Sequence, residues 1–187
     1  MYTLPTLLFT IFSFVSVSSF SYLSEVYPYS VDLPEPVDEL ILDNYLGNWF
    51  QVYGAPTNVI FQGYGTCITA EYGLFDNGTI SVLNSQLNRD GEYETIEGYA
   101  YYKNGSNPGQ LTVHLQGVPT DSPYWVVKLG EIVDEEYQYS IVTTPSAISL
   151  WVLARDLDIF YDLYHEEVTE YLDNFFYRYV EIVQTNC

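Results

Sequence analysis

The fold of this chain is decided by the stretch Asp43-Asn44-Tyr45-Leu46-Gly47-Asn48-Trp49-Phe50-Gln51-Val52-Tyr53. It places a Gly-x-Trp motif, Gly47 and Trp49, at the start of the first segment with a strand pattern. A Gly-x-Trp alone is weak evidence for any architecture. Its weight comes from the segments that follow, which read as one short strand after another and then one late helix.

Eight segments carry the alternating or apolar pattern of short strands. Asp76-Asn77-Gly78-Thr79 joins two of them, and Asn-Gly between alternating runs is a strong hairpin signal. Eight short strands at this spacing predict a β-sandwich or a β-barrel. The segments are Asn48 to Gly54, Thr66 to Leu74, Ile80 to Leu87, Glu94 to Tyr102, Leu111 to Leu115, Tyr124 to Leu129, Tyr137 to Thr143 and Leu150 to Ala154.

The period changes after the eighth strand. Within Ile159 to Asn174, large apolar side chains recur with helical spacing, and acidic residues fill the other positions. This pattern predicts an amphipathic helix lying on an apolar surface. Residues 176–183 alternate again and predict a short ninth strand. The residues assigned to the apolar face of the helix are Tyr164, Val168, Tyr171 and Phe175.

The N-terminus predicts export. Leu4 to Val17 is an apolar run without charge that closes on Ser18 and Ser19, typical of a secretory signal peptide at residues 1–19, although the usual basic residues are missing. No other stretch approaches the roughly 20 apolar residues that span a membrane, so integral membrane association is not expected. Residues 20–42 predict an extended acidic arm, and residues 43–187 one domain that is secreted and extracellular.

Charge excludes two classes of partner. Five Lys and Arg stand against 25 Asp and Glu, a formal net charge of −20. Such a surface repels nucleic-acid phosphates and anionic lipid headgroups. The simplest role of the charge is solubility, because 48% of the residues are hydrophobic.

Taken together, the motifs resemble those of the lipocalins, and within that family apolipoprotein D and its bacterial and invertebrate relatives. The resemblance implies an all-β fold, an eight-stranded antiparallel up-and-down β-barrel (the lipocalin calyx) with one C-terminal helix packed outside and a short final strand. It also implies a carrier that binds a small lipophilic ligand inside the barrel. The stretches that carry it are Asn44 to Trp49, Gly65 to Tyr72, Asp76 to Asn84, Ile96 to Ala100, Ser122 to Val127 and Leu150 to Arg155.

The same resemblance assigns structural residues. Gly47 and Trp49 close the narrow end of the barrel, and Arg155 packs over the Trp49 indole in a cation–π contact worth about 0.5–2 kcal/mol. The period of two supports this, because it places Arg155 on the strand face that carries Trp151 and Leu153.

Cavity residues are implied in the same way. An eight-stranded barrel can just hold one small ligand. None of the assigned positions is basic, which favours a neutral sterol, retinoid or carotenoid, or a protonated fatty acid, over an ionised carboxylate. The ligand-binding candidates are Tyr45, Tyr72, Asn84, Gln86, Leu115 and Trp151.

A secreted chain is expected to carry two kinds of covalent modification, a disulfide bond and N-linked glycans. Cys67 and Cys187 are the only cysteines and are expected to bond to each other. Asn77 and Asn104 head glycosylation sequons in hairpin turns. In lipocalin topology both turns lie at the closed end, while residues 55–65, 87–92, 116–122 and 143–148 frame the mouth.

Other functions are less well supported. His114 and His165 are isolated, and the sequence has no metal-ligand spacing and no nucleophile elbow. The acidic residues around Glu94 fit a solvated strand face better than a catalytic pair. We therefore expect neither an enzyme nor a metal or other cofactor. Sequestration of a small amine or chromophore stays an alternative, as do a lipocalin-type enzyme and an adhesive surface built from 20 tyrosines. A cell-surface receptor and a homodimer stay open. The lack of a second cysteine pair and the acidic connection from Leu129 to Tyr137 depart from the family pattern.

Overall fold

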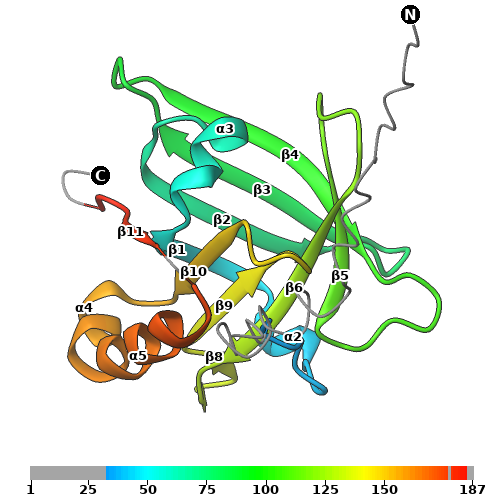
Figure 1. Cartoon of the computed structure of the whole chain (residues 1–187). Coiled ribbons are helices and arrows are strands. Elements are labelled where there is room, and N and C mark those ends of the chain that lie inside the picture. The colour runs from blue at the N-terminus through cyan, green and yellow to red at the C-terminus, as the bar shows by residue number, and fades with distance from the viewer. Residues whose placement is uncertain (1–32, 177, 185–187) are drawn as a thin grey trace, which may run out of the picture. The chain divides into compact units, whose positions relative to one another are not determined.

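A closed antiparallel barrel forms the centre of the protein. The computed structural model describes residues 33–176 and 178–184 (Figure 1). The main sheet has the order β10-β9-β6-β5-β4-β3-β2-β1-β11, and β10 also pairs with β1. Since the two ends of the eight-stranded run pair with each other, the sheet closes, and the predicted eight-stranded barrel is confirmed.

The strands begin and end within two residues of the predicted bounds, because the turns between them are marked in the sequence by Gly, Asn and Pro. A short helix precedes the barrel, and two short helical turns lie between its first two strands. In chain order the elements are α2 Leu42–Tyr45, β1 Gly47–Gly54, η1 Pro56–Asn58, α3 Val59–Gln62, β2 Thr66–Leu74, β3 Ile80–Leu87, β4 Tyr93–Tyr101, β5 Gln110–Leu115, β6 Ser122–Leu129, β9 Tyr139–Thr143 and β10 Leu150–Ala154.

The acidic connection between β6 and β9 contains a hairpin that the sequence did not predict. Strands β7 Ile132–Val133 and β8 Glu136–Tyr137 pair as a separate two-stranded sheet. The two residues of its turn, Asp134 and Glu135, both have positive φ angles, 49° and 67°. A turn of this kind normally uses Asn-Gly, so the acidic pair carried no recognisable turn signal.

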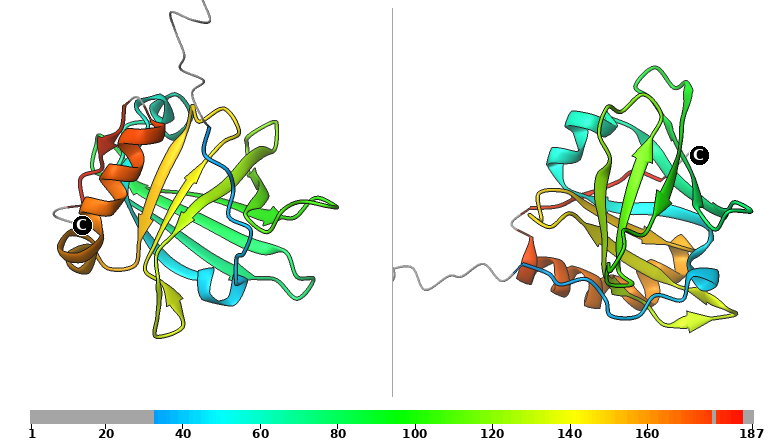
Figure 2. Two further views of the ribbon diagram at one scale, coloured as in Figure 1. Left: turned by 60° about the horizontal axis from the view of Figure 1, so that its bottom comes forward. Right: turned by 90° about the vertical axis from the view of Figure 1, so that its right-hand side faces the viewer.

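The C-terminal helical segment lies on the outer face of the barrel (Figure 2). It consists of α4 Leu157–Ile159, a π-helical turn η2 Phe160–Tyr164 and α5 His165–Phe175, and the Asp156 side chain caps its start by accepting from the Ile159 amide at 2.9 Å. The buried face differs from the predicted one. Tyr164 and Val168 are buried as expected, but Phe160 and Leu172 complete the row, while Tyr171 and Phe175 are half-buried at its edge.

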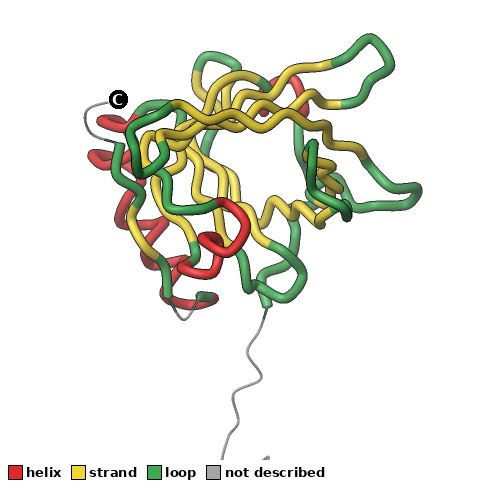
Figure 3. The backbone as a smooth tube through the Cα atoms, turned by 90° about the horizontal axis from the view of Figure 1, so that it is seen from above, coloured by secondary structure: helices red, strands yellow, loops and turns green. Residues whose placement is uncertain are grey.

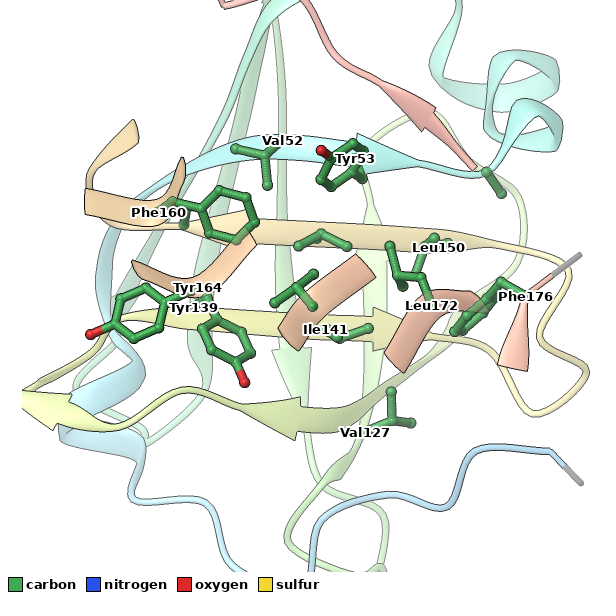
Figure 4. Packing of buried hydrophobic residues seen from close by; sticks show 14 residues of the cluster. Val52, Tyr53, Val127, Tyr139, Ile141, Leu150, Phe160, Tyr164, Leu172 and Phe176 are labelled. Atoms are coloured by element: carbon green, nitrogen blue, oxygen red, sulfur yellow. The ribbon is translucent and has the colours of Figure 1, made fainter. Parts of the chain in front are cut away.

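The helix is held by an apolar cluster between it and strands β1, β9 and β10 (Figure 4). Alternate residues of β10, Leu150 and Val152, point outward into this cluster, whereas Trp151 and Leu153 belong to the cluster inside the barrel. Phe160 and Leu172 are fully buried against it. Burying each such side chain stabilises the fold by about 1.5–3 kcal/mol, so the helix is firmly docked on that side of the barrel.

The C-terminal tail runs beside β1 and β2. Strand β11, Val180–Glu181, pairs with β1 and is shorter than the predicted strand of residues 176–183. Beyond it, the Cys67 amide donates to the Val183 carbonyl oxygen at 2.8 Å. Cys187 lies outside the described residues, so its disulfide with Cys67 stays a prediction. The signal peptide at residues 1–19 and residues 20–32 of the arm also lie outside them. Residues 33–41 run without helix or strand and bond to β6 through Val37.

Candidate ligand-binding site

The narrow end of the barrel is closed by Trp49 and Arg155. Trp49 is 0% exposed, and its indole Nε1 donates to the Tyr45 carbonyl oxygen at 2.9 Å. The guanidinium carbon of Arg155 lies 3.7 Å from the centroid of the indole, which is the cation–π contact expected from the sequence. Gly47 has a φ of +97°, and a Cβ there would lie 3.1 Å from Arg155 Nη1. The backbone conformation therefore favours glycine, and a Cβ would also press on the Arg155 guanidinium.

Arg155 does more than cover the indole. Its guanidinium donates hydrogen bonds to four backbone carbonyl oxygens from two segments, and the carboxylate of Glu136 lies 4.0 Å away. Burial lowers the pKa of Arg155, while Glu136 opposes that shift. The carbonyl oxygens belong to Asn44 at 3.2 Å, Leu46 at 2.6 Å, Asn48 at 2.7 Å and Tyr137 at 3.3 Å. The residue thus ties the entry to β1 to the β8 segment.

Above this closure the barrel holds a cavity of about 430 Å³. Viewed from above, the strands surround the barrel interior and the long helix lies outside it (Figure 3). Among the described residues, no lysine, arginine or histidine lines the cavity, and the one carboxylate in its lining is that of Glu94. The apolar part of the wall includes Ile68, Ala70, Val82, Ile96, Val113, Leu115 and Leu153. Such a lining suits a ligand with a hydrocarbon body and few polar atoms.

The mouth of the cavity lies at the end predicted from lipocalin topology. Gln62 of α3, Val118 of the β5–β6 loop and Thr144 of the β9–β10 loop all line it. The sequon residues Asn77 and Asn104 are exposed in the β2–β3 and β4–β5 turns, at the opposite end of these strands. A glycan at either position would leave the mouth open.

Five of the six predicted ligand-binding residues line the cavity. Tyr72 and Asn84 lie on β2 and β3, Gln86 lies at the mouth end of β3, Leu115 on β5 and Trp151 on β10. Tyr45, the sixth, does not line it. Its ring lies one layer below, stacked on Tyr72 with a centroid separation of 5.7 Å and tilted on Trp49 at 5.3 Å. The short helix α2 that precedes β1 places Tyr45 in the closure rather than in the cavity wall.

Three glutamines join the mouth loop to the barrel. Gln62 Nε2 donates to Gln51 Oε1 at 2.9 Å, and Gln62 Oε1 accepts from Trp151 Nε1 at 3.3 Å. The Gln62 backbone oxygen also accepts from Gln86 Nε2 at 3.0 Å. Within the described residues, Gln86 Oε1 is buried without a hydrogen-bond partner. The sequence did not identify Gln62, because α3 is too short to show a helical period, and it missed Gln51, although two-residue alternation from Trp49 on β1 would have placed it inside.

A chain of hydroxyl groups begins at the floor of the cavity, with Tyr72 and Tyr124, and continues below it. Tyr124 OH lies 3.0 Å from Tyr72 OH and 2.8 Å from Tyr45 OH, and Tyr45 OH lies 2.9 Å from Ser140 Oγ. Burial raises the pKa of Tyr72 to about 12 and the pKa of Tyr124 well above its usual range. All these phenols are therefore protonated near neutral pH. The sequence missed Tyr124, although two-residue alternation from Val126 would have placed it inside.

The acids and histidines lie outside the cavity, with Glu94 the exception at its rim. Glu94 accepts from Asn88 Nδ2 at 2.8 Å and Gln86 Nε2 at 3.3 Å, and these hydrogen bonds lower its pKa. The expectation that Glu94 belongs only to a solvated strand face is thus incomplete. His114 pairs with Asp121 at 2.8 Å, outside the cavity lining.

No group of three or more His, Cys, Asp or Glu within residues 33–176 and 178–184 is placed to hold a metal ion. In the same part of the chain, no helix combines the length and the apolar character needed to cross a membrane.

Comparison with known proteins identifies the family. A family model described as a lipocalin-like domain matches residues 39–182. The outer membrane lipoprotein Blc of Vibrio cholerae is 38% identical over 122 residues, which cover 65% of this chain and 68% of that protein. Apolipoprotein D of Rattus norvegicus is 39% identical over 93 residues, covering 49% of this chain and 48% of the relative. The matches thus span about half to two thirds of these curated relatives.

Solved structures agree on the fold. Lobster apocrustacyanin A1 superposes with a TM-score of 0.58 at 16% identity, covering 86% of this chain and 94% of that one. Identity at this level supports the fold alone. With the family match over residues 39–182 and the closed barrel with its outer helix, the chain belongs to the lipocalin family, whose members bind small hydrophobic ligands.

Proposed function

We propose that this protein is a carrier that binds one neutral lipophilic molecule of the sterol, retinoid, carotenoid or protonated fatty-acid type inside its barrel, for transport or storage. The observation that carries the proposal is the cavity of about 430 Å³, whose wall is mainly apolar and, in the part of the chain that the structure describes, holds no basic side chain. Cavities of this size and lining bury most of a small ligand's surface.

The absence of a base from the lining favours a neutral ligand. Moving an ionised carboxylate into an apolar cavity is costly unless a cation or several donors meet it. The guanidinium at the closed end, that of Arg155, is already committed to four carbonyl oxygens and the Trp49 indole. The floor instead offers phenol hydroxyls from Tyr72 and Tyr124, which suit an uncharged oxygen.

Sequestration of a small amine is the second candidate, and Glu94 is the observation that favours it. Its carboxylate lines the cavity mouth and has a lowered pKa, so it is ionised at neutral pH. It is, however, a rim group that is already hydrogen-bonded to Asn88 and Gln86. If the amine role holds, tryptamine binds to the wild-type protein and Glu94→Gln abolishes that binding. If the neutral carrier role holds, the substitution leaves binding of a neutral lipophile unchanged.

We also propose that the protein is secreted, glycosylated and disulfide-bonded. The apolar run at residues 4–17 and the exposed sequons Asn77 and Asn104 support this. The tail supports the Cys67–Cys187 bond, since Val183 is hydrogen-bonded to Cys67 only four residues before Cys187. One relative is by name an outer membrane lipoprotein, so the location must be tested directly. The test is expression in a eukaryotic host: the protein should appear in the medium, and treatment with a glycosidase should lower its mass.

The carrier proposal is tested by native mass spectrometry of protein purified from such a host, alongside organic extraction. We expect a bound lipophile whose mass matches a neutral compound in the extract. An empty protein that also fails to bind added retinoids, sterols and fatty acids would overturn the proposal.

A further inference from the structure

The hydroxyl groups at the cavity floor contain one hydrogen more than they can use among themselves. Tyr72, Tyr124, Tyr45 and Ser140 form an unbranched chain of three hydroxyl–hydroxyl contacts of 3.0, 2.8 and 2.9 Å. Each hydroxyl carries one hydrogen to donate. Four hydrogens and three contacts leave one hydrogen without an acceptor in the chain, whichever way the contacts are directed.

Burial decides where that hydrogen goes. Ser140 is 0% exposed and Tyr45 is 4% exposed, and neither lines the cavity. A donor left unpaired at either site costs about 1–3 kcal/mol. Tyr72 and Tyr124 do line the cavity, so a hydrogen left on either of them can meet whatever the cavity holds. The favoured direction therefore runs from Ser140 towards the floor, which makes the floor a net hydrogen-bond donor.

We propose that the ligand binds with an uncharged oxygen acceptor, such as a ketone carbonyl, against Tyr72 and Tyr124, and with its hydrocarbon body towards the mouth. This rests on the proposed carrier function and adds the chemistry and orientation of the ligand. The lining beside the floor supports the orientation, because Val82 of β3 is the cross-strand partner of Tyr72 and Leu153 of β10 faces inward. Apolar side chains of this kind contact a hydrocarbon body, while the oxygen takes the surplus hydrogen.

A matched ligand pair tests the inference. The ligands are 5α-cholestan-3-one and 5α-cholestane, which differ by one ketone oxygen, and each displaces the neutral probe N-phenyl-1-naphthylamine. Either tyrosine alone can supply the hydrogen, so the informative variant is Tyr72→Phe/Tyr124→Phe. We expect the ratio of the two dissociation constants, hydrocarbon over ketone, to fall about fivefold to tenfold in the double variant.

The control is Ser140→Ala, which shortens the chain at its far end. Three hydroxyls with two contacts still leave one surplus hydrogen at the floor, so the ratio should stay at its wild-type value. If the double variant keeps the wild-type ratio, or if Ser140→Ala lowers it equally, the inference is wrong. If neither ligand displaces the probe from the wild-type protein, it is the carrier proposal that fails.

A second measurement needs no variant. The infrared stretch of 13C-labelled cholestanone bound to the wild-type protein should lie at lower wavenumber than in hexane, because a donated hydrogen weakens the carbonyl bond. A bound ketone that absorbs as it does in hexane would overturn the inference even if the double variant did not fold.

Discussion

The guanidinium carbon of Arg155 lies 3.7 Å above the indole of Trp49, and the two residues are 106 positions apart in the sequence. The contact joins the first barrel strand to the residue that follows the last one. The same guanidinium donates hydrogen bonds to the carbonyl oxygens of Asn44, Leu46 and Asn48, so it fixes the chain on both sides of Gly47. The closed end is therefore held mainly by one side chain.

Replacing Arg155 should destabilise the whole barrel. We expect Arg155→Met to lower the free energy of unfolding by about 3 kcal/mol, because four carbonyl oxygens lose their donor and the Trp49 indole loses its cation. Arg155→Lys should lower it less, since one ammonium group reaches fewer of them. Urea unfolding measures both. Arg89→Met is the control, because Arg89 lies 3.8 Å over the ring of exposed Tyr64 and should change stability by less than about 0.5 kcal/mol. Equal effects of the two methionine variants would contradict this role of Arg155.

Stability should fall at alkaline pH through Tyr72. Its pKa is 10.0 as an unperturbed phenol and about 12 in the folded protein, where burial disfavours the phenolate. A raised folded-state pKa contributes stability that is complete below pH 10 and is lost as the pH rises through 12. The difference corresponds to about 3 kcal/mol. Urea midpoints between pH 8 and 12 should therefore fall less steeply for Tyr72→Phe than for wild type. The exposed Tyr93→Phe serves as the control, and a slope in Tyr72→Phe equal to wild type would refute the assignment.

The cysteine pair should stabilise the protein in its oxidised form. A bridge from Cys67 to Cys187 closes a loop of more than 100 residues, worth about 4–5 kcal/mol in the chain-entropy model. Intact mass under non-reducing conditions should be two hydrogens lower than after reduction, and the urea midpoint should drop on reduction. The double variant Cys67→Ser/Cys187→Ser should not respond to reductant. Two free thiols in freshly purified protein would contradict the pairing.

Ligand binding should protect one tryptophan. Trp151 lines the cavity, whereas Trp125 of β6 packs in the outer cluster below the helix. We expect 5α-cholestan-3-one to reduce acrylamide quenching of the wild-type fluorescence, and Trp125→Phe to preserve that protection. Trp151→Phe should remove most of it. Protection that survives in Trp151→Phe would place the ligand outside the cavity.

The strand bounds and the closure could be predicted because their signals are local. Asn77-Gly78 marks a turn whatever surrounds it, and alternation along β10 separates the inward Trp151 from the outward Val152. The Arg155 contact followed from the same alternation together with the family resemblance. These are properties of a few neighbouring residues, so the sequence alone displays them.

The remaining parts of the site depend on irregular or long-range geometry. The register of β6 shifts between Val126 and Lys128, so alternation is interrupted beyond Val126 and the inward face of this strand can be read only from Tyr124 and Val126. Ser140 joins the hydroxyl chain below the floor only because β9 carries it to Tyr45, 95 residues away in sequence. The helix face was misassigned at Tyr171 because Leu172 offers an equally apolar row, and only docking on the barrel selects between the two rows.

The most direct test of the carrier account fills the cavity with a tryptophan from β3 and compares it with a tryptophan on the other face of the same strand. Asn84 lines the cavity, while its neighbour Leu83 does not, and the two alternate on β3. The measurement is the dissociation constant of N-phenyl-1-naphthylamine for wild type, Asn84→Trp and Leu83→Trp. The account predicts that Asn84→Trp abolishes binding and that Leu83→Trp, which puts the same side chain on the other face of the strand, leaves it within about twofold of wild type. Equal binding by all three proteins would show that the ligand does not enter the barrel.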